Sequence, residues 1–264
     1  MEPAVFIGSA TVVVFFVVFG GIYTQLAAET FEAIQSFIVS RFGWFYILTA
    51  TFLLVFVLWL LVSPYGKIRL GGENSKPEFS YFAWFTMLFS AGMGTGLVFW
   101  GVAEPMNHYV SPPLGEGETS AALEEAMRIS FFHWGFHPWA IYIVFGLSLA
   151  YYHFRHKLPL APRSLLYPII GTKIYGPVGH TVDILATVGT LFGVATSLGF
   201  GAMQINSGVS EITDVANDRN TQVVIIAVIT LAATISVVLG LHKGIQRLSE
   251  TNVILAGILL LFVF

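Results

Sequence analysis

Long apolar runs alternate with short polar segments along the whole chain, and this pattern predicts transmembrane helices. A helix needs about 20 mostly apolar residues to cross the hydrocarbon core of a bilayer. Runs of that length predict spans at residues 4–23, 44–62, 79–103, 129–152, 182–205 and 222–241. A seventh run begins near Asn252, and only about 13 residues remain before the sequence ends at Phe264. We therefore expect the N-terminal part of a longer protein, cut within its seventh span.

The segment Leu26–Val39 is too short and too polar to be a further span. Glu29 and Glu32 fall on one face of a helix, while Phe31 and Ile34 fall on another. This pattern predicts an amphipathic helix that lies in the outer membrane interface.

The connecting segments predict the orientation. His108–Thr119 is a polar loop, and Leu158–Pro177, which contains four prolines, is expected to be an interfacial loop with a short helix. With the N-terminus in the cytoplasm, cytoplasmic loops hold nine basic residues and outer segments hold three, as the positive-inside rule requires. The nine are Lys67, Arg69, Lys76, Arg155, Lys157, Arg163, Lys173, Lys243 and Arg247. We therefore expect a multi-pass protein of the inner (plasma) membrane with a cytoplasmic N-terminus, in contact with the lipid bilayer.

Composition excludes several classes of protein. The 264 residues are 56% hydrophobic and 10% charged, whereas soluble domains carry about 25% charged residues. The chain has no cysteine, which excludes disulfides and thiolate ligands, and it has no basic block suited to nucleic acid. It also shows no catalytic triad, phosphate loop or pair of carboxylates at membrane depth. We therefore expect no enzyme and no cofactor.

The third span contains the run Gly92-Met93-Gly94-Thr95-Gly96. Each glycine costs roughly 1 kcal/mol against alanine in a helix interior. A broken helix in lipid is tolerated where its backbone lines a cavity or is buried in protein, and its bare carbonyls can then bind a cation. The run therefore predicts a span that is non-helical around Gly92–Gly96 at a transporter's binding site. The alternative is close helix packing through Gly92 and Gly96.

The fourth span opens with several aromatic residues. On a continuous helix, Trp134, Tyr142 and Trp139 fall within about 140° and can share one side. Their ring faces would attract a quaternary ammonium group by cation–π interaction. An aromatic belt at the membrane interface is the alternative. Pro138 is expected to kink this span or to lie in its first turn.

Other polar residues in the spans have more ordinary interpretations. His133 and His137 are four apart but lack further metal ligands, which favours structural roles. Glu104 ends the third span, where it either functions or ties the span to a neighbour. Asp183 is assigned to the positive end of the fifth-span helix dipole.

Three long motifs resemble those of the betaine/choline/carnitine transporter (BCCT) family, in the family's order. They are residues 92–105 (GMGTGLVFWGVAEP), 133–142 (HWGFHPWAIY) and 197–205 (SLGFGAMQI). The resemblance covers essentially the whole chain.

The resemblance implies an all-α polytopic membrane protein of twelve spans with a LeuT-like inverted repeat in spans three to twelve. Residues 1–264 would be the N-terminal part of that transporter domain, truncated within the seventh helix. Residues 1–78 would form two leading spans and the amphipathic helix, and residues 79–264 would form the first repeat, incomplete.

The resemblance also implies a binding site. The substrate would lie beside Met93, Gly94 and Gly96, and sodium would bind the backbone carbonyls of Ser90 and Met93. The family's aromatic box maps onto Trp134, Trp139 and Tyr142, which favours a cage over a belt.

Two positions distinguish members of the family, one by substrate and the other by sodium binding. Members that carry choline tend to have Asp at the position of Gly96, so its absence here favours a zwitterion such as glycine betaine. A second sodium site would use two threonines, of which Thr190 matches the first while Val194 occupies the second, so that site is in doubt.

The predicted function is sodium-coupled import of glycine betaine or a related quaternary-ammonium solute by alternating access, with sodium as the coupling ion. Family members are often homotrimers. The alternatives are a proton-coupled or exchange carrier for choline, carnitine or ectoine, and, outside carriers, a channel or membrane sensor.

Overall fold

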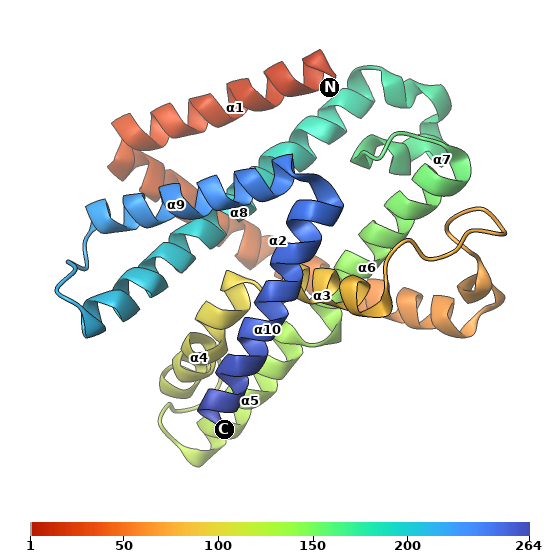
Figure 1. Cartoon of the computed structure of the whole chain (residues 1–264). Coiled ribbons are helices and arrows are strands. Elements are labelled where there is room, and N and C mark those ends of the chain that lie inside the picture. The colour runs from red at the N-terminus through yellow and green to blue at the C-terminus, as the bar shows by residue number, and fades with distance from the viewer. Residues whose placement is uncertain (1) are drawn as a thin grey trace. The chain divides into compact units, whose positions relative to one another are not determined.

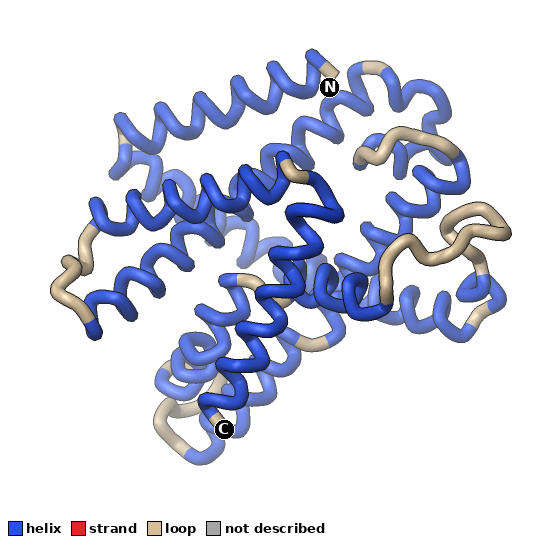
Figure 2. The backbone as a smooth tube through the Cα atoms, in the orientation of Figure 1, coloured by secondary structure: helices blue, strands red, loops and turns tan. Residues whose placement is uncertain are grey.

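The structure is a computed structural model that describes residues 2–264, and all of its regular elements are helices (Figures 1 and 2). It divides into two compact units. The first unit comprises Met1–Ser75 with Phe131–Phe192, and the second comprises Lys76–Ser130 with Gly193–Phe264. Two helices, α5 (Ser120–Trp134) and α8 (Pro177–Ile212), contribute residues to both units.

The first unit is built on two long helices, a shorter one and a chain of short turns. The elements are α1 (Pro3–Ile22), α2 (Thr24–Val62), η1 (Pro64–Lys67), α6 (Phe136–Ala150), the π-helical η2 (Tyr151–Arg155), η3 (Pro162–Leu166), α7 (Tyr167–Ile170) and η4 (Gly171–Tyr175). α2 packs along α6. The short helices of residues 162–175 confirm the predicted loop with helix between the fourth and fifth spans.

The second unit contains α3 (Tyr81–Gly92), α4 (Thr95–Val110), α9 (Arg219–Val238), the π-helical η5 (Leu241–Ile245) and α10 (Gln246–Val263). α10 packs against α3. Asp218 caps α9 by accepting a hydrogen bond from the backbone N–H of Thr221 at 2.9 Å. That hydrogen bond holds the pKa of the Asp218 carboxyl below its ordinary value.

The helices agree with a multi-pass, all-α membrane protein. Within residues 2–264, five helices are long and apolar enough to cross a bilayer. The number is six if the bent pair α3 and α4 forms one span. The predicted fourth span is divided at Gly135 between α5 and α6. The predicted loop at His108–Thr119 begins later than expected, because α4 continues through Pro105 to Val110.

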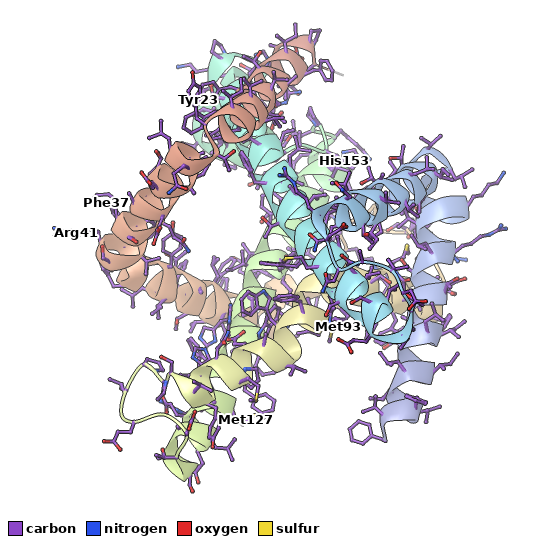
Figure 3. All side chains as sticks on the ribbon, turned by 90° about the vertical axis from the view of Figure 1, so that its left-hand side faces the viewer. Tyr23, Phe37, Arg41, Met93, Met127 and His153 are labelled. Carbon is purple, nitrogen blue, oxygen red and sulfur yellow. The ribbon has the colours of Figure 1, made fainter. Side chains whose placement is uncertain are left out.

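The segment Leu26–Val39 is helical, as predicted, but it is not a separate helix. It is the first part of α2, which continues without a break to Val62. No proline lies between the two predicted segments, and Gly43 is tolerated within the helix. Figure 3 shows that α2 changes direction around Arg41.

The assignment of Asp183 to the helix dipole is wrong. α8 begins at Pro177, so Asp183 lies beyond the first turn, where the dipole effect has faded. Its buried carboxylate instead accepts a hydrogen bond from the backbone N–H of Arg163 at 2.9 Å and lies 3.1 Å from that residue's Nε. The pair fastens the connecting segment to the start of α8.

Candidate functional site

The third span is broken at Met93 and Gly94. α3 ends at Gly92, α4 begins at Thr95, and the two helices are bent by 52°. The N–H of Met93 still donates to the carbonyl of Phe89, at 2.7 Å. The break therefore confirms the prediction that the glycine run interrupts this helix, and it confines the interruption to two residues.

The break leaves backbone carbonyl groups and backbone N–H groups without their hydrogen-bond partners within a helix. The last carbonyls of α3, including that of Ser90, lack the N–H donors that another helical turn would supply. The first N–H groups of α4, at Thr95 and Gly96, lack acceptors for the same reason. A negative helix end and a positive helix end therefore meet at Met93 and Gly94.

A cavity of about 380 Å³ lies against this break, within the second unit. Its volume falls within the range of about 300–1,000 Å³ that is typical of ligand pockets. The lining residues, none of which carries a formal charge, are Phe89, Ser90, Met93, Gly94, Thr95, Val98, Gly201, Gln204, Ile205, Asn252, Leu255 and Ala256. The structure thus brings the predicted Ser90, Met93 and Gly94 together at one cavity. Gly96 is not among its lining residues.

The first and third sequence motifs pack against each other in this unit. A Cβ atom at Gly201 of α8 would lie 3.0 Å from Cγ2 of Thr95, so the start of α4 lies directly on α8. One turn further on, the rings of Phe99 and Phe200 stack with their centroids 4.7 Å apart. Trp100 meets Phe200 edge-on at 5.7 Å. These contacts fix one wall of the cavity relative to the break.

The aromatic residues of the predicted fourth span do not lie on one continuous helix. α5 ends at Trp134 and α6 begins at Phe136, with Gly135 between them. The derivation that placed Trp134, Trp139 and Tyr142 on one helical face is therefore wrong, because it assumed an unbroken helix. Pro138 lies in the first turn of α6, which is one of the two places expected for it.

The structure nevertheless links these three residues, all in the first unit. The indole Nε1 of Trp139 donates to the backbone carbonyl of Trp134 at 3.1 Å. The rings of Trp139 and Tyr142 lie 6.0 Å apart at 40°. Trp139 is half-buried, while 67% of Tyr142 is exposed. Two aromatic faces thus lie together on α6, and Trp134 is joined to them through its carbonyl.

The remaining polar residues have local partners. The hydroxyl of Thr190 donates to the carbonyl of Ala186 at 2.8 Å, the ordinary bond of a threonine within a helix. Glu104 is buried, and its Oε1 lies 3.6 Å from Nε2 of His108 one turn along α4. The rings of His137 and Phe132 lie 4.5 Å apart and are tilted by 48°. No cluster of three or more His, Asp or Glu able to hold a metal ion occurs in residues 2–264.

Sequence reasoning missed two features that shape these sites. One is the division at Gly135, whose signal is a glycine followed three residues later by proline, an order typical of a helix that restarts. The other is the contribution of Gln204 and Asn252 to the cavity, which depends on long-range packing and leaves no local signal.

Comparison with known proteins identifies the family. The family model described as "BCCT, betaine/carnitine/choline family transporter" matches residues 4–264. A glycine betaine transporter of Acinetobacter baylyi is 47% identical over 268 residues, which cover 100% of this chain and 40% of that protein. A glycine betaine transporter of Bacillus subtilis is 47% identical over 247 residues, covering 93% of this chain and 48% of that protein. A high-affinity choline transport protein of Escherichia coli is 43% identical over 263 residues, covering 100% of this chain and 39% of that protein.

The chain thus spans less than half the length of these relatives. The match nevertheless runs through both units and all three sequence motifs. The chain therefore belongs to the betaine/carnitine/choline transporter family.

Proposed function

We propose that the protein to which this chain belongs imports glycine betaine or a closely related zwitterion, with sodium as the coupling ion and by alternating access. The broken span at Met93 and Gly94, open to an uncharged cavity, is the observation that carries this proposal. The names of the glycine betaine transporters among its relatives support the same substrate.

The two helix ends at the break suit a ligand that brings both charges. The N-terminal end of α4, at Thr95, can receive a carboxylate through its free N–H groups. The C-terminal end of α3 can offer the carbonyls of Ser90 and Met93 to a sodium ion. The cavity lining has no formal charge, which suits a zwitterion because its own two charges balance.

Trp134, Trp139 and Tyr142 are the residues proposed to bind the quaternary ammonium group. Such a cation cannot donate strong hydrogen bonds, so aromatic faces are a suitable receptor for it. The close rings of Trp139 and Tyr142 support this role.

Choline is the second candidate substrate, because one relative is named a high-affinity choline transport protein. Choline lacks a carboxylate and would make no use of the N-terminal end of α4. Gly96 provides no carboxylate to balance the net positive charge of choline, which favours the zwitterion.

The proposal also covers the arrangement of the spans, their orientation in the membrane and the second sodium site. A LeuT-like inverted repeat, a cytoplasmic N-terminus and an inner-membrane location would fit the broken third span and the distribution of basic residues. The second sodium site is proposed to be weak or absent, because Val194 offers no oxygen beside Thr190.

The test is uptake of labelled glycine betaine by the full-length protein in proteoliposomes. We expect uptake to require an inward sodium gradient and to be inhibited by unlabelled glycine betaine more strongly than by choline, carnitine or ectoine. Counter-flow of labelled substrate separates a carrier from a channel. Stronger inhibition by choline than by the zwitterions would overturn the proposed substrate assignment. Sodium-independent uptake would overturn the proposal that sodium is the coupling ion.

A further inference from the structure

Two adjoining hollows in the first unit differ sharply in chemistry. One, of about 550 Å³, lies between α2 and α6 and is lined mainly by aromatic and aliphatic side chains. The other, of about 300 Å³, is lined by Lys67, Ile68, Arg69, Glu73 and Arg155. Ile68 lines both, so the apolar hollow and the basic one adjoin at this residue.

The aromatic residues of the larger hollow fix its depth in a bilayer. Tryptophan and tyrosine prefer the level of the lipid headgroups. Trp59 of α2 and Tyr65 of η1 line this hollow, with ring centroids 5.6 Å apart, and Tyr151 and Tyr152 of η2 line it as well. Lys67 and Arg69 follow Tyr65 along the chain, and Arg155 follows Tyr152, so we expect the basic hollow at the depth of lipid phosphates.

The cations of the smaller hollow form no ion pairs with carboxylates within residues 2–264. Arg69 donates to the backbone carbonyl of Glu73 at 2.7 Å, and Arg155 donates to the backbone carbonyl of Arg69 at 3.1 Å. No ion pair of Lys67, Arg69 or Arg155 with a carboxylate is present in the described part of the chain. With Glu73 as the one acid in the lining, the hollow keeps a surplus of positive charge.

We propose that these two hollows form a binding site for an anionic glycerophospholipid. Its phosphate would lie among Lys67, Arg69 and Arg155, and one acyl chain would pass over Ile68 into the hollow between α2 and α6. Basic pockets at the cytoplasmic ends of transmembrane helices are suited to anionic headgroups. The inference rests on the membrane setting of the chain and not on its transported substrate.

The test is native mass spectrometry of the purified full-length protein titrated with phosphatidylglycerol and, separately, with phosphatidylcholine of the same acyl chains. We expect tighter binding of phosphatidylglycerol. A basic residue near an anionic headgroup contributes roughly fivefold in affinity, so Lys67→Gln with Arg69→Gln should weaken phosphatidylglycerol binding roughly 25-fold. Phosphatidylcholine binding should change little. Trp59→Leu alters the apolar hollow alone and should weaken both lipids equally.

The matched control is Lys243→Gln with Arg247→Gln, which also removes two positive charges but lies in the other unit. It should leave the preference for phosphatidylglycerol intact. The proposal is overturned if the control reduces that preference as much as the Lys67 and Arg69 variant does, or if neither variant changes it. Displacement of the lipid by millimolar glycerol phosphate would also overturn it, because the site would then recognise a soluble anion. Melting temperatures of all the variants, measured in parallel, exclude loss of the fold as the cause.

Discussion

The chain interrupts two of its predicted spans at glycine, and the two interruptions differ in what surrounds them. At Gly94, the N-cap of α4, a Cβ atom would meet nothing within 4 Å, and a cavity adjoins the backbone. At Gly135, the N-cap of α6, a Cβ atom would lie 2.5 Å from the carbonyl oxygen of Phe131. Glycine is therefore required by the backbone at Gly135, whereas at Gly94 the protein has room for a side chain.

We infer from this difference that the break at Gly135 is structural, and we propose that the break at Gly94 serves a ligand. The break at Gly135 is closed by the protein itself, since Trp139 donates its indole N–H to the carbonyl of Trp134 across it. The break at Gly94 has no such bridging hydrogen bond among the described residues, and its backbone carbonyl and N–H groups lie beside a cavity. Because both glycines are N-caps, substituting each by alanine gives a matched pair of variants.

The largest effect on stability is expected from Gly135→Ala. The added methyl group would force the backbone away from Phe131, and overpacking of this kind lowers the free energy of unfolding by about 1–3 kcal/mol. Alanine is also a poorer N-cap than glycine, which lowers the stability further. Thermal melting of the full-length protein measures it. A melting temperature equal to that of Gly94→Ala would contradict the division into structural and ligand-serving breaks.

Gly94→Ala should do the opposite, with little change in melting temperature and a large loss of substrate affinity. Its φ of −95° and ψ of −168° are accessible to alanine, and the methyl group would extend into open space. One extra methyl group in a ligand site costs about 10-fold or more in binding. Titration of purified protein with glycine betaine measures this loss. Unchanged affinity would mean that the ligand does not approach Gly94.

The aromatic residues beside the structural break give a smaller, separable effect. Trp139→Leu and Trp139→Phe both lose the hydrogen bond to Trp134, worth about 1 kcal/mol of stability. Only leucine also loses the aromatic face, which should lower substrate affinity by about 5- to 30-fold relative to the parent.

Phenylalanine at position 139 should retain part of that affinity, and Trp44→Leu serves as a control distant in sequence. If Trp139→Leu binds glycine betaine as tightly as the parent protein, the rings form an aromatic belt and not a cage.

The smallest effect is expected from Thr190→Val. The threonine hydroxyl already donates to Ala186, and Val194 supplies no oxygen, so a sodium ion gains little there. The sodium concentration that gives half-maximal uptake should change by less than about twofold, equivalent to roughly 0.4 kcal/mol. A large loss of sodium dependence would instead identify Thr190 as a ligand of the coupling ion.

Most of the helices were predictable from sequence because apolar runs of spanning length leave few alternatives. The break at Met93 was predictable because three alternating glycines conflict with a helix. The break at Gly135 was missed because a single glycine is tolerated in many helices. The pairing of Asp183 with Arg163 and the position of Gln204 beside the third span depend on tertiary packing, which no local pattern encodes.

The most direct test of the central claim is protection of a cysteine placed in the cavity beside the open break. The chain has no cysteine of its own, and Val98 lines the cavity, so Val98→Cys, with any cysteine elsewhere in the full-length protein replaced, gives one reporter. We predict that a water-soluble thiol reagent labels it and that saturating glycine betaine with sodium slows the labelling several-fold. Labelling that is unaffected by glycine betaine in a variant that still transports it would show that the ligand binds elsewhere.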